Sequence, residues 1–290
     1  MTKGDKIVVT GSKGQLGHAL CLWLSNNGID NVVAVDLDEL DITNEVAVGD
    51  FFAVERPQYI INCAAYTAVD RAESEPLQCR QVNAVAVGVL AHAAKKYGTR
   101  MVHISTDYVF DGNTNRPYIE NDATNPLQEY GASKLEGERM LLDSEADAVV
   151  LRTQWLYSPW GVNFVKTMLR LGRERSSLRV VADQIGSPTS ALDLATAIGM
   201  IITGDRWTSG VYHCSSEGVA SWFDFTLAIH ELAGITKCAV TPCDTSQYPT
   251  PAKRPLYGVM NKAKLHDKFG IEMPHWRNSL KACLTQMQEL

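Results

Sequence analysis

Tyr130 and Lys134 are spaced so that together they could carry out proton transfer. Residues four apart lie on one face of a helix. A free tyrosine has a pKa of about 10, and a nearby cation lowers that value because it favours the phenolate. An interaction of about 4 kcal/mol would bring the pKa to about 7, and a lysine with a positively charged cofactor could supply it. The pair therefore predicts a proton donor, although two residues at this spacing also fit an ordinary contact on a helix surface.

The glycine-rich segment 11–17 is a candidate for binding the pyrophosphate of a dinucleotide. It follows the first apolar segment and precedes a helical pattern. Glycines at such a turn let backbone N–H groups approach a phosphate at the start of a helix. The spacing is G-x-x-G-x-x-G, which differs by one residue from G-x-G-x-x-G, so an ordinary glycine turn is the alternative. The predicted cofactor-binding residues here are Gly11, Gly14, Gln15, Leu16 and Gly17.

Asp36 ends the second apolar segment, about twenty residues after the glycine turn, where a carboxylate could accept hydrogen bonds from the adenosine ribose. It would also repel a 2′-phosphate, which favours NADH without excluding NADPH. A solvated loop aspartate is the alternative. Asp41 and Ile42 could flank the adenine. After the third apolar segment, small residues allow close approach of the backbone to a ligand, which adds Ala64, Ala65, Tyr66 and Thr67 to the cofactor site.

The elements that must position these residues can be read from the first half of the chain. Short apolar segments at 7–9, 32–35, 59–61, 101–104 and 149–151 alternate with helical patterns ending near 26 and spanning 46–54, 77–96 and 130–142. Continuous apolar strands separated by helices are typical of a parallel sheet covered on both faces. The sequence therefore predicts an α/β fold with a Rossmann-like, doubly wound parallel sheet.

The second half of the chain is less regular. Proline and glycine are frequent at 159–188 and 242–255, and helical patterns occur at 164–173, 191–202, 221–233 and 276–287. We predict a dinucleotide-binding domain over 1–157 and a smaller C-terminal α/β lobe for the substrate over 158–290. Helix 191–204 is expected to return to the first domain.

Bulk composition excludes several classes of function. A net charge of −6 over 290 residues argues against nucleic acid as a partner. The apolar stretch near 198–202 is too short to span a bilayer, and no polybasic membrane anchor is present. A strand pattern that begins by Ile7 leaves no room for a signal peptide. The seven scattered cysteines, none in a Cys-x-x-Cys pair, fit reduced thiols. We expect a cytoplasmic protein that binds neither membranes nor nucleic acid.

Taken together, the motifs resemble the extended short-chain dehydrogenase/reductases and, more closely, the dTDP-4-dehydrorhamnose reductase family. The matching segments are 11–17, 62–70, 105–110, 130–134, 152–155, 163–164, 183–189 and 249–255. They cover nearly the whole chain. No single motif is specific, but their combination is.

This resemblance implies a reaction and a set of roles. NADPH or NADH would reduce the 4-keto group of dTDP-4-dehydro-L-rhamnose to give dTDP-L-rhamnose. Tyr130 would donate the proton, Lys134 would lower the pKa of the phenol and bind the ribose, and both would contact the cofactor. Thr106 would supply a hydroxyl to the substrate carbonyl, with the neighbouring Ser105 as its rival. The substrate contacts implied are Thr106, Asp107, Tyr130, Trp155 and Arg254; a core aromatic and a surface charge are the alternatives for the last two.

Several relatives remain as alternatives. Sugar dehydratases carry Asp-Glu after the threonine, whereas this chain has Asp107-Tyr108, which favours a simple reductase. A non-catalytic regulatory subunit resembling that of methionine adenosyltransferase, or a reductase that makes another deoxy-sugar nucleotide such as a talose, stays open. Some relatives use an early carboxylate to bind magnesium between subunits. Here that stretch is 18–20, His-Ala-Leu, so no metal is predicted and that form of dimer is disfavoured, while a homodimer of another kind stays possible.

Overall fold

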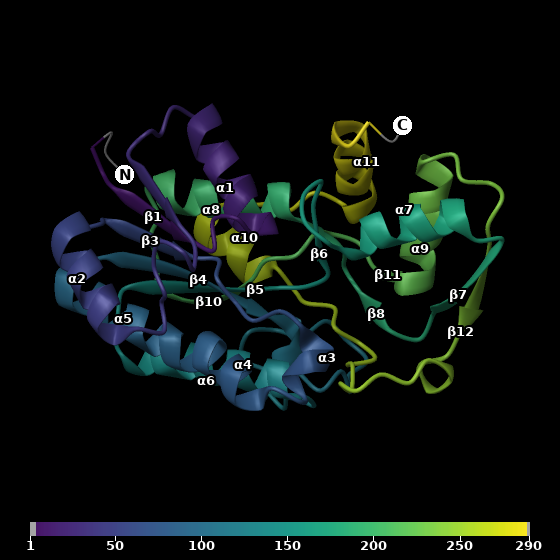
Figure 1. The fold of residues 1–290 in the computed structure, drawn as a ribbon, viewed down its shortest axis with the longest axis horizontal. Helices are drawn as coiled ribbons and strands as arrows, with labels where there is room; N and C mark the ends of the chain where they lie inside the picture. Colours follow the sequence, from purple (N-terminus) through teal and green to yellow (C-terminus); the bar gives the residue numbers. More distant parts are fainter. Residues whose placement is uncertain (1–3, 289–290) are drawn as a thin grey trace.

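The computed structural model describes residues 4–288, and a six-stranded parallel sheet forms its centre (Figure 1). The strands are β1 (Ile7–Thr10), β2 (Val32–Val35), β3 (Tyr59–Asn62), β4 (Arg100–Thr106), β5 (Ala148–Thr153) and β10 (Gly210–His213). They lie in the order β10-β5-β4-β3-β1-β2, and each neighbouring pair is parallel. Strands β1, β3 and β5 are buried along their whole length, as expected for a sheet with helices on both faces. The predicted α/β, Rossmann-like fold is confirmed.

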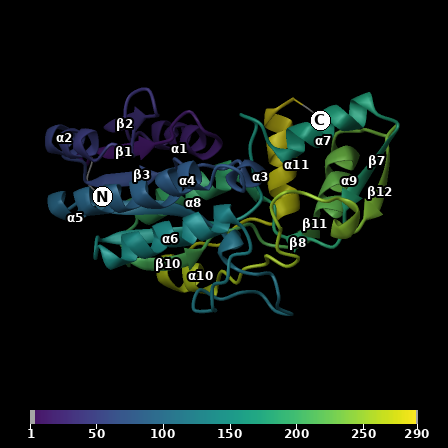
Figure 2. The same cartoon turned by 60° about the horizontal axis from the view of Figure 1, so that its bottom comes forward.

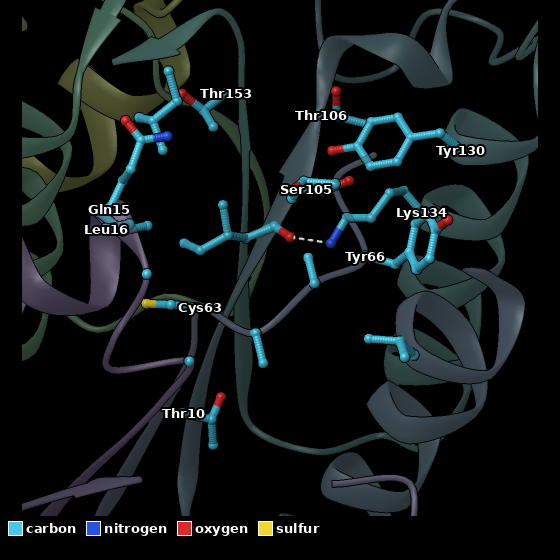
Figure 3. Close-up of a pocket in the computed structure, with 18 of the residues that line it drawn as sticks. Thr10, Gln15, Leu16, Cys63, Tyr66, Ser105, Thr106, Tyr130, Lys134 and Thr153 are labelled. Atoms are coloured by element: carbon cyan, nitrogen blue, oxygen red, sulfur yellow. Dashed lines mark hydrogen bonds between the residues drawn. The ribbon is translucent and has the colours of Figure 1, made fainter. Parts of the chain in front are cut away.

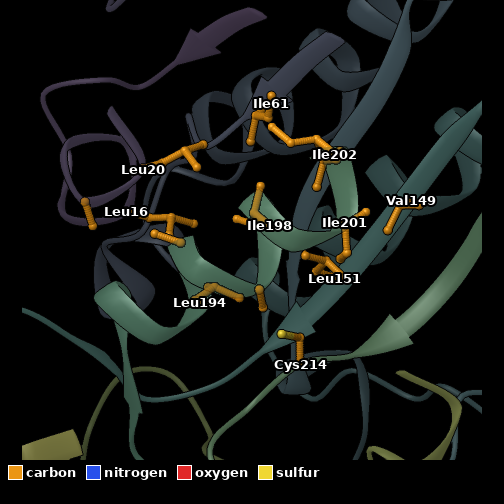
Figure 4. Packing of buried hydrophobic residues seen from close by; sticks show 14 of the residues in the cluster. Leu16, Leu20, Ile61, Val149, Leu151, Leu194, Ile198, Ile201, Ile202 and Cys214 are labelled. Atoms are coloured by element: carbon orange, nitrogen blue, oxygen red, sulfur yellow. The ribbon is translucent and has the colours of Figure 1, made fainter. Parts of the chain in front are cut away.

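Helices cover the sheet in two layers. On one face, α1 (Gln15–Asn26) packs beside α8 (Ala191–Thr203), and leucines of α1 together with leucine and isoleucines of α8 reach the strands (Figure 4). On the other face lie α2 (Glu45–Glu55), α5 (Ala86–Tyr97) and α6 (Glu129–Asp143), with Phe52, Leu90 and Leu141 in a second apolar cluster. Among the described residues, no helix is long and apolar enough to cross a membrane.

The predicted helix over 77–96 is interrupted. It consists of α4 (Pro76–Arg80), one π-helical turn, η1 (Gln81–Val85), and α5. A π turn inserts a residue into a helix and changes the direction of the side chains that follow, and such turns are frequent at functional sites. Here it lies beside α6 and contains the buried residue Asn83.

A smaller lobe packs at one end of the sheet (Figure 2). Its main elements are α7 (Phe164–Glu174), β7 (Ser177–Val181), α9 (Trp222–Leu232), β12 (Ala239–Cys243) and α11 (Trp276–Gln286). Strands β7 and β12 are parallel, and aromatic residues including Tyr157, Phe225 and Trp276 form the core.

The remaining short elements of the two lobes are α3 (Val69–Ala72), η2 (Asp107–Val109), β6 (Leu156–Tyr157), β8 (Ile185–Gly186), β9 (Thr189–Ser190), β11 (Ala220–Ser221), η3 (Thr245–Gln247) and α10 (Ala263–Phe269).

The chain crosses between the two lobes more often than the sequence predicted. Helix α8 packs on α1, and β10 then pairs with β5 as the edge of the main sheet. Leu265 of α10 also lies in the apolar cluster under α1 and α8. Besides the helix 191–204 that was expected to return to the first domain, β10 and α10 from the 158–290 segment therefore pack with it as well.

Candidate active site

A cavity of about 1040 Å³ opens at the carboxyl ends of the central strands (Figure 3). Strand order reverses between β1 and β3, and open parallel sheets bind ligands at such a switch point. Residues of the smaller lobe, including Val162, Asn163 and Trp222, complete the wall. Of the predicted site residues, the lining includes Gly11, Gly14, Gln15, Leu16, Asp36, Asp41, Ile42, Ala64, Ala65, Tyr66, Thr67, Thr106, Asp107, Tyr130, Lys134 and Trp155. Gly17 and Arg254 are not among the lining residues.

The glycine turn is shaped for close approach of a phosphate. Gly11 has a φ of 64°, and a Cβ there would lie 2.7 Å from the backbone nitrogen of Ala64. A Cβ on Gly17 would lie 2.2 Å from the oxygen of Gly11, so this glycine lets α1 start directly behind the turn. The N-terminal turn of α1 supplies N–H groups that favour an anion. These residues fit the pyrophosphate of a dinucleotide.

Asp36, which also lines the cavity, is held by the backbone that surrounds it. Its Oδ2 accepts from the N–H of Lys13 at 2.9 Å, and its Oδ1 accepts from the N–H of Leu37 at 2.9 Å. The side chain of Lys13 forms exposed ion pairs with Asp38 and Glu39. The Asp36 carboxylate at this position fits recognition of a ribose. The Lys13 side chain places a positive charge in the same loop region.

Asn83 holds the 64–67 segment in place and was missed by the sequence analysis. Its Oδ1 accepts from the backbone N–H of Tyr66 at 2.8 Å, and its Nδ2 donates to the backbone oxygen of Tyr66 at 3.0 Å. Nδ2 also lies 3.1 Å from the hydroxyl of Ser133 in α6. Asn83 lies in the π turn, which sets the direction of its side chain. No periodic pattern in the sequence predicts such a turn.

Tyr130 and Thr106 meet at the opposite side of the cavity from Gln15 and Leu16 (Figure 3). Burial raises the pKa of the Tyr130 phenol above its ordinary value, and a hydrogen bond with Thr106 partly offsets that rise. Lys134 was expected to lower this pKa, but in the protein alone desolvation of the phenol outweighs the hydrogen bond with Thr106 that lowers it. Tyr130 therefore carries its proton at neutral pH, as a proton donor must.

The contacts of Ser105 and Thr106 distinguish the two rival hydroxyls. Ser105 donates to Glu138, whose carboxylate is paired in the core with Arg152 at 2.6 Å. Thr106 bonds Tyr130 and donates to Asp107 at 3.1 Å. Burial raises the pKa of Asp107 to about 7, so this carboxyl can be either neutral or charged near neutral pH. The geometry favours Thr106 over Ser105 as the hydroxyl that acts with Tyr130.

Lys134 is buried, and residues of β4 bond its amine. Its Nζ donates to the backbone oxygen of Ile104 at 2.5 Å (the dashed line in Figure 3) and lies 3.4 Å from Nε2 of His103. Burial lowers the pKa of Lys134 to about 8, against the opposing charge of Glu138. The lysine is thus poised to be charged at neutral pH and to lose its proton in mildly basic solution.

Two tryptophans, one from each lobe, meet at the wall of the cavity. Trp155 follows β5 with a φ of 48°, a left-handed conformation that is uncommon for a bulky residue. Its ring stacks on Trp222 of α9 with centroids 3.5 Å apart, and both rings line the cavity. Arg254 instead forms a two-point ion pair with Asp70, at 3.0 and 2.9 Å, and bonds the hydroxyl of Thr250.

Further cavity residues were not predicted from the sequence. Gln154 is buried, and its Oε1 accepts from the N–H of Ser187. Within residues 4–288, its Nε2 and the hydroxyl of Thr153 have no hydrogen-bond partner, although both residues line the cavity. The position of Gln154 next to Trp155 was the one available signal. Trp222 lies far from the other site residues in sequence, and only the fold brings it there.

Comparisons with known proteins agree with this geometry. The family model for the RmlD substrate binding domain matches residues 5–289. A dTDP-4-dehydrorhamnose reductase of Aggregatibacter actinomycetemcomitans is 43% identical over 95% of this chain and 97% of its own length. The crystal structure of a Clostridium acetobutylicum dTDP-4-dehydrorhamnose reductase is 42% identical with a TM-score of 0.94, covering 98% of this chain and 99% of that one. The Bacillus anthracis enzyme in complex with NADP is 39% identical with a TM-score of 0.93, covering 97% and 99%.

Proposed function

The chain belongs to the dTDP-4-dehydrorhamnose reductase family, and from that premise we propose that it reduces the 4-keto group of dTDP-4-dehydro-L-rhamnose to give dTDP-L-rhamnose. It is an NAD(P)H-dependent oxidoreductase. The observation that carries the proposal is the meeting of Tyr130, Thr106 and Lys134 in a cavity that also contains the glycine turn.

The residues of the chain divide the chemistry among them. A reduced nicotinamide, when bound, supplies the hydride. Tyr130 holds a proton at neutral pH because burial raises its pKa, so it can protonate the alkoxide that develops on the substrate oxygen. Thr106, bonded to Tyr130, can turn its one hydroxyl proton from Asp107 to the same oxygen and stabilise its charge. The ammonium of Lys134 favours the phenolate that Tyr130 becomes after proton transfer.

The substrate end of the cavity offers both apolar surface and hydrogen-bonding groups. The Trp155–Trp222 stack presents aromatic surface, and Asp107, Gln154 and Thr153 supply polar atoms to a sugar. Arg254 is proposed to act near the nucleotide portion, and its position beside Asp70 would require the substrate to approach that ion pair.

For the cofactor, we propose that NADH is used at least as well as NADPH. Asp36 supports this proposal because a carboxylate beside the ribose repels a 2′-phosphate. The ratio of kcat/KM for the two cofactors is the relevant measurement. A strong preference for NADPH would contradict the proposal. The seven cysteines, which form no disulfide, support a site of action in the cytosol.

A direct assay tests the proposed reaction. Purified protein, NADH or NADPH and dTDP-4-dehydro-L-rhamnose should consume the cofactor, and NMR of the product should identify dTDP-L-rhamnose. Tight cofactor binding without consumption would overturn the proposal and point to a regulatory protein. A product that differs at the new hydroxyl, such as a talose nucleotide, would keep the reductase chemistry and overturn the assigned sugar.

A further inference from the structure

A row of buried polar side chains runs beneath Lys134, from β1 through β3 and β4. The hydroxyl of Thr10 lies 2.7 Å from Oδ1 of Asn62, and Nδ2 of Asn62 lies 3.2 Å from Nδ1 of His103. Nε2 of His103 lies 3.4 Å from Nζ of Lys134. All four residues are at most 2% exposed. The row thus begins at a residue that lines the cavity beside the glycine turn and ends at Lys134.

We propose that His103 is a positioning residue for Lys134 that changes its tautomer with the charge of the lysine. The inference deepens the proposed function, because it concerns how the same site keeps Lys134 charged. His103 contacts Lys134 and does not line the cavity, so it would act through the lysine and not on the substrate.

Counting donors and acceptors limits the row to two arrangements. A neutral imidazole has one donor nitrogen and one acceptor nitrogen. When Lys134 is an ammonium, Nε2 must accept from it, so Nδ1 carries the hydrogen and the Asn62 oxygen must face His103. When Lys134 is a neutral amine, Nε2–H donates to it, and Nδ1 accepts from the Asn62 amide N–H. The two orientations of an amide place heavy atoms at the same points, and the Thr10 hydroxyl can donate or accept at the far end.

The exchange between the two arrangements balances in protons. Going from the charged to the neutral arrangement moves one proton from Nζ of Lys134 to Nε2 of His103. The proton on Nδ1 is released to water, and the Asn62 amide turns over. The pair loses one proton in total, so the tautomer of His103 reports the charge of Lys134.

The surroundings keep His103 neutral in both arrangements. Burial, together with the charge of Lys134, holds the pKa of His103 well below its ordinary range, so an imidazolium does not compete. The groups that act on Lys134 are the Glu138 carboxylate and the thiols of Cys63 and Cys79, all of which favour the ammonium, and the Ile104 oxygen, which accepts from it. Removing His103 leaves the ammonium without one of its two acceptors.

A charged hydrogen bond is about twice as strong as a neutral one, so contact with His103 favours the ammonium over the amine. We therefore expect His103→Leu to move the basic limb of the kcat–pH profile to lower pH, by about one pH unit. His103→Gln should keep the wild-type limb, because an amide can also donate or accept near the Nε2 position. His213→Gln is the matched control: this histidine is equally buried and bonds the backbone oxygens of Tyr118 and Asn261, and within residues 4–288 it forms no hydrogen bond with Lys134.

A second measurement does not depend on turnover and remains informative if His103→Leu fails to fold. Nitrogen NMR of the labelled wild-type protein without substrate should show neutral His103 changing from the Nδ1–H to the Nε2–H tautomer as pH rises through the titration of Lys134. The change should be absent in Lys134→Met. A single tautomer at every pH, or equal shifts of the basic limb in His103→Leu and His213→Gln, would overturn the inference. The NMR result stands even if the substrate assignment is wrong, so the two failures are distinguishable.

Discussion

At the scale of single residues, the hydroxyl of Tyr130 is the group to which we assign the proton transfer. Tyr130→Phe removes the proton donor and keeps the ring that packs edge-on against Tyr108. We expect turnover to fall by about 10²-fold or more, because acid catalysis of this kind contributes about 10²–10⁴-fold. Affinity for NADH, measured by fluorescence titration, should survive.

The control for this substitution is Tyr97→Phe, which removes a hydroxyl from a ring that packs on Phe52 in the second apolar cluster. It should leave turnover within a factor of about two, since surface and cluster-edge changes rarely reach the site. Near-normal turnover by Tyr130→Phe would refute the assigned proton donor.

The pH dependence of turnover follows from Lys134. Its pKa is lowered by burial to about 8, so the ammonium is present below that pH and is lost as the pH rises through it. Once Lys134 is a neutral amine, it no longer favours the phenolate of Tyr130. We expect kcat to fall with a midpoint near pH 8, in the profile measured with saturating cofactor and substrate. In Lys134→Arg, which stays charged, this limb should disappear even if the rate is lower.

Residue types and spacing singled out Tyr130, Lys134 and the glycine turn as candidates, because tyrosine, lysine and glycine carry distinctive chemistry at fixed spacing, whereas Thr106, Asp107 and Trp155 came from the family resemblance. Asn83 and Gln154 were missed for the opposite reason. An amide is an ordinary residue in a helix or after a strand, and only its burial and partners mark it as part of the site. Arg254 was assigned to the site from its motif, yet it lies in an ion pair with Asp70 outside the cavity lining.

At the scale of secondary structure, the π turn and α6 are fitted to each other. A Cβ on Gly137 of α6 would lie 2.1 Å from the backbone oxygen of Asn83. Gly137→Ala should therefore push the two elements apart and destabilise the protein by about 1–3 kcal/mol, the usual cost of overpacking. Thermal unfolding measures this effect, and cofactor affinity should weaken with it because Asn83 holds the 64–67 segment.

Gly49→Ala gives the matched comparison. Gly49 lies inside α2, and a Cβ there would meet nothing within 4 Å. Alanine is favoured over glycine in a helix interior by about 1 kcal/mol, so this variant should be slightly more stable than the wild type. If both variants changed stability equally, the close approach of α6 to the π turn would not be the cause.

The positions of the first five strands and most helices were predictable, since their apolar segments are continuous and their helical patterns are long. The π turn was not predictable, because one inserted residue barely changes the helical period of 3.6 residues. Strands β6, β8, β9 and β11 have two residues each, too few for a pattern to form. Strand β10 is equally hard to place, because its partner β5 is about sixty residues away in sequence. Nothing in the sequence near β10 predicts which strand it pairs with.

At the scale of the whole molecule, the contact between Trp155 and Trp222 joins the lobes at the part of the cavity that we propose for the substrate. Aromatic pairs contribute about 0.5–1.5 kcal/mol beyond the area they bury. Trp222→Leu should raise the KM for the nucleotide sugar by up to about tenfold while the KM for NADH stays constant. Steady-state kinetics with each substrate varied in turn separates the two.

Trp207 provides the control for that substitution. It packs against Tyr59 on the sheet and is not among the residues that line the cavity. Trp207→Leu should change stability without changing the KM for the sugar nucleotide. An unchanged KM in Trp222→Leu would show that the stacked pair does not support the substrate end.

The place of β10 at the edge of the main sheet has a consequence for dividing this protein. A fragment ending at residue 157 would contain the glycine turn and the Tyr130–Lys134 pair, yet it would lack the strand that pairs along β5. The unpaired edge would be Val149, Val150 and Leu151, which are fully buried in the intact chain. Exposed apolar edges recruit other strands, so such a fragment should self-associate on expression instead of behaving as an independent nucleotide-binding unit. The later half of the chain completes the sheet that the earlier half begins, so we expect the two lobes to fold together.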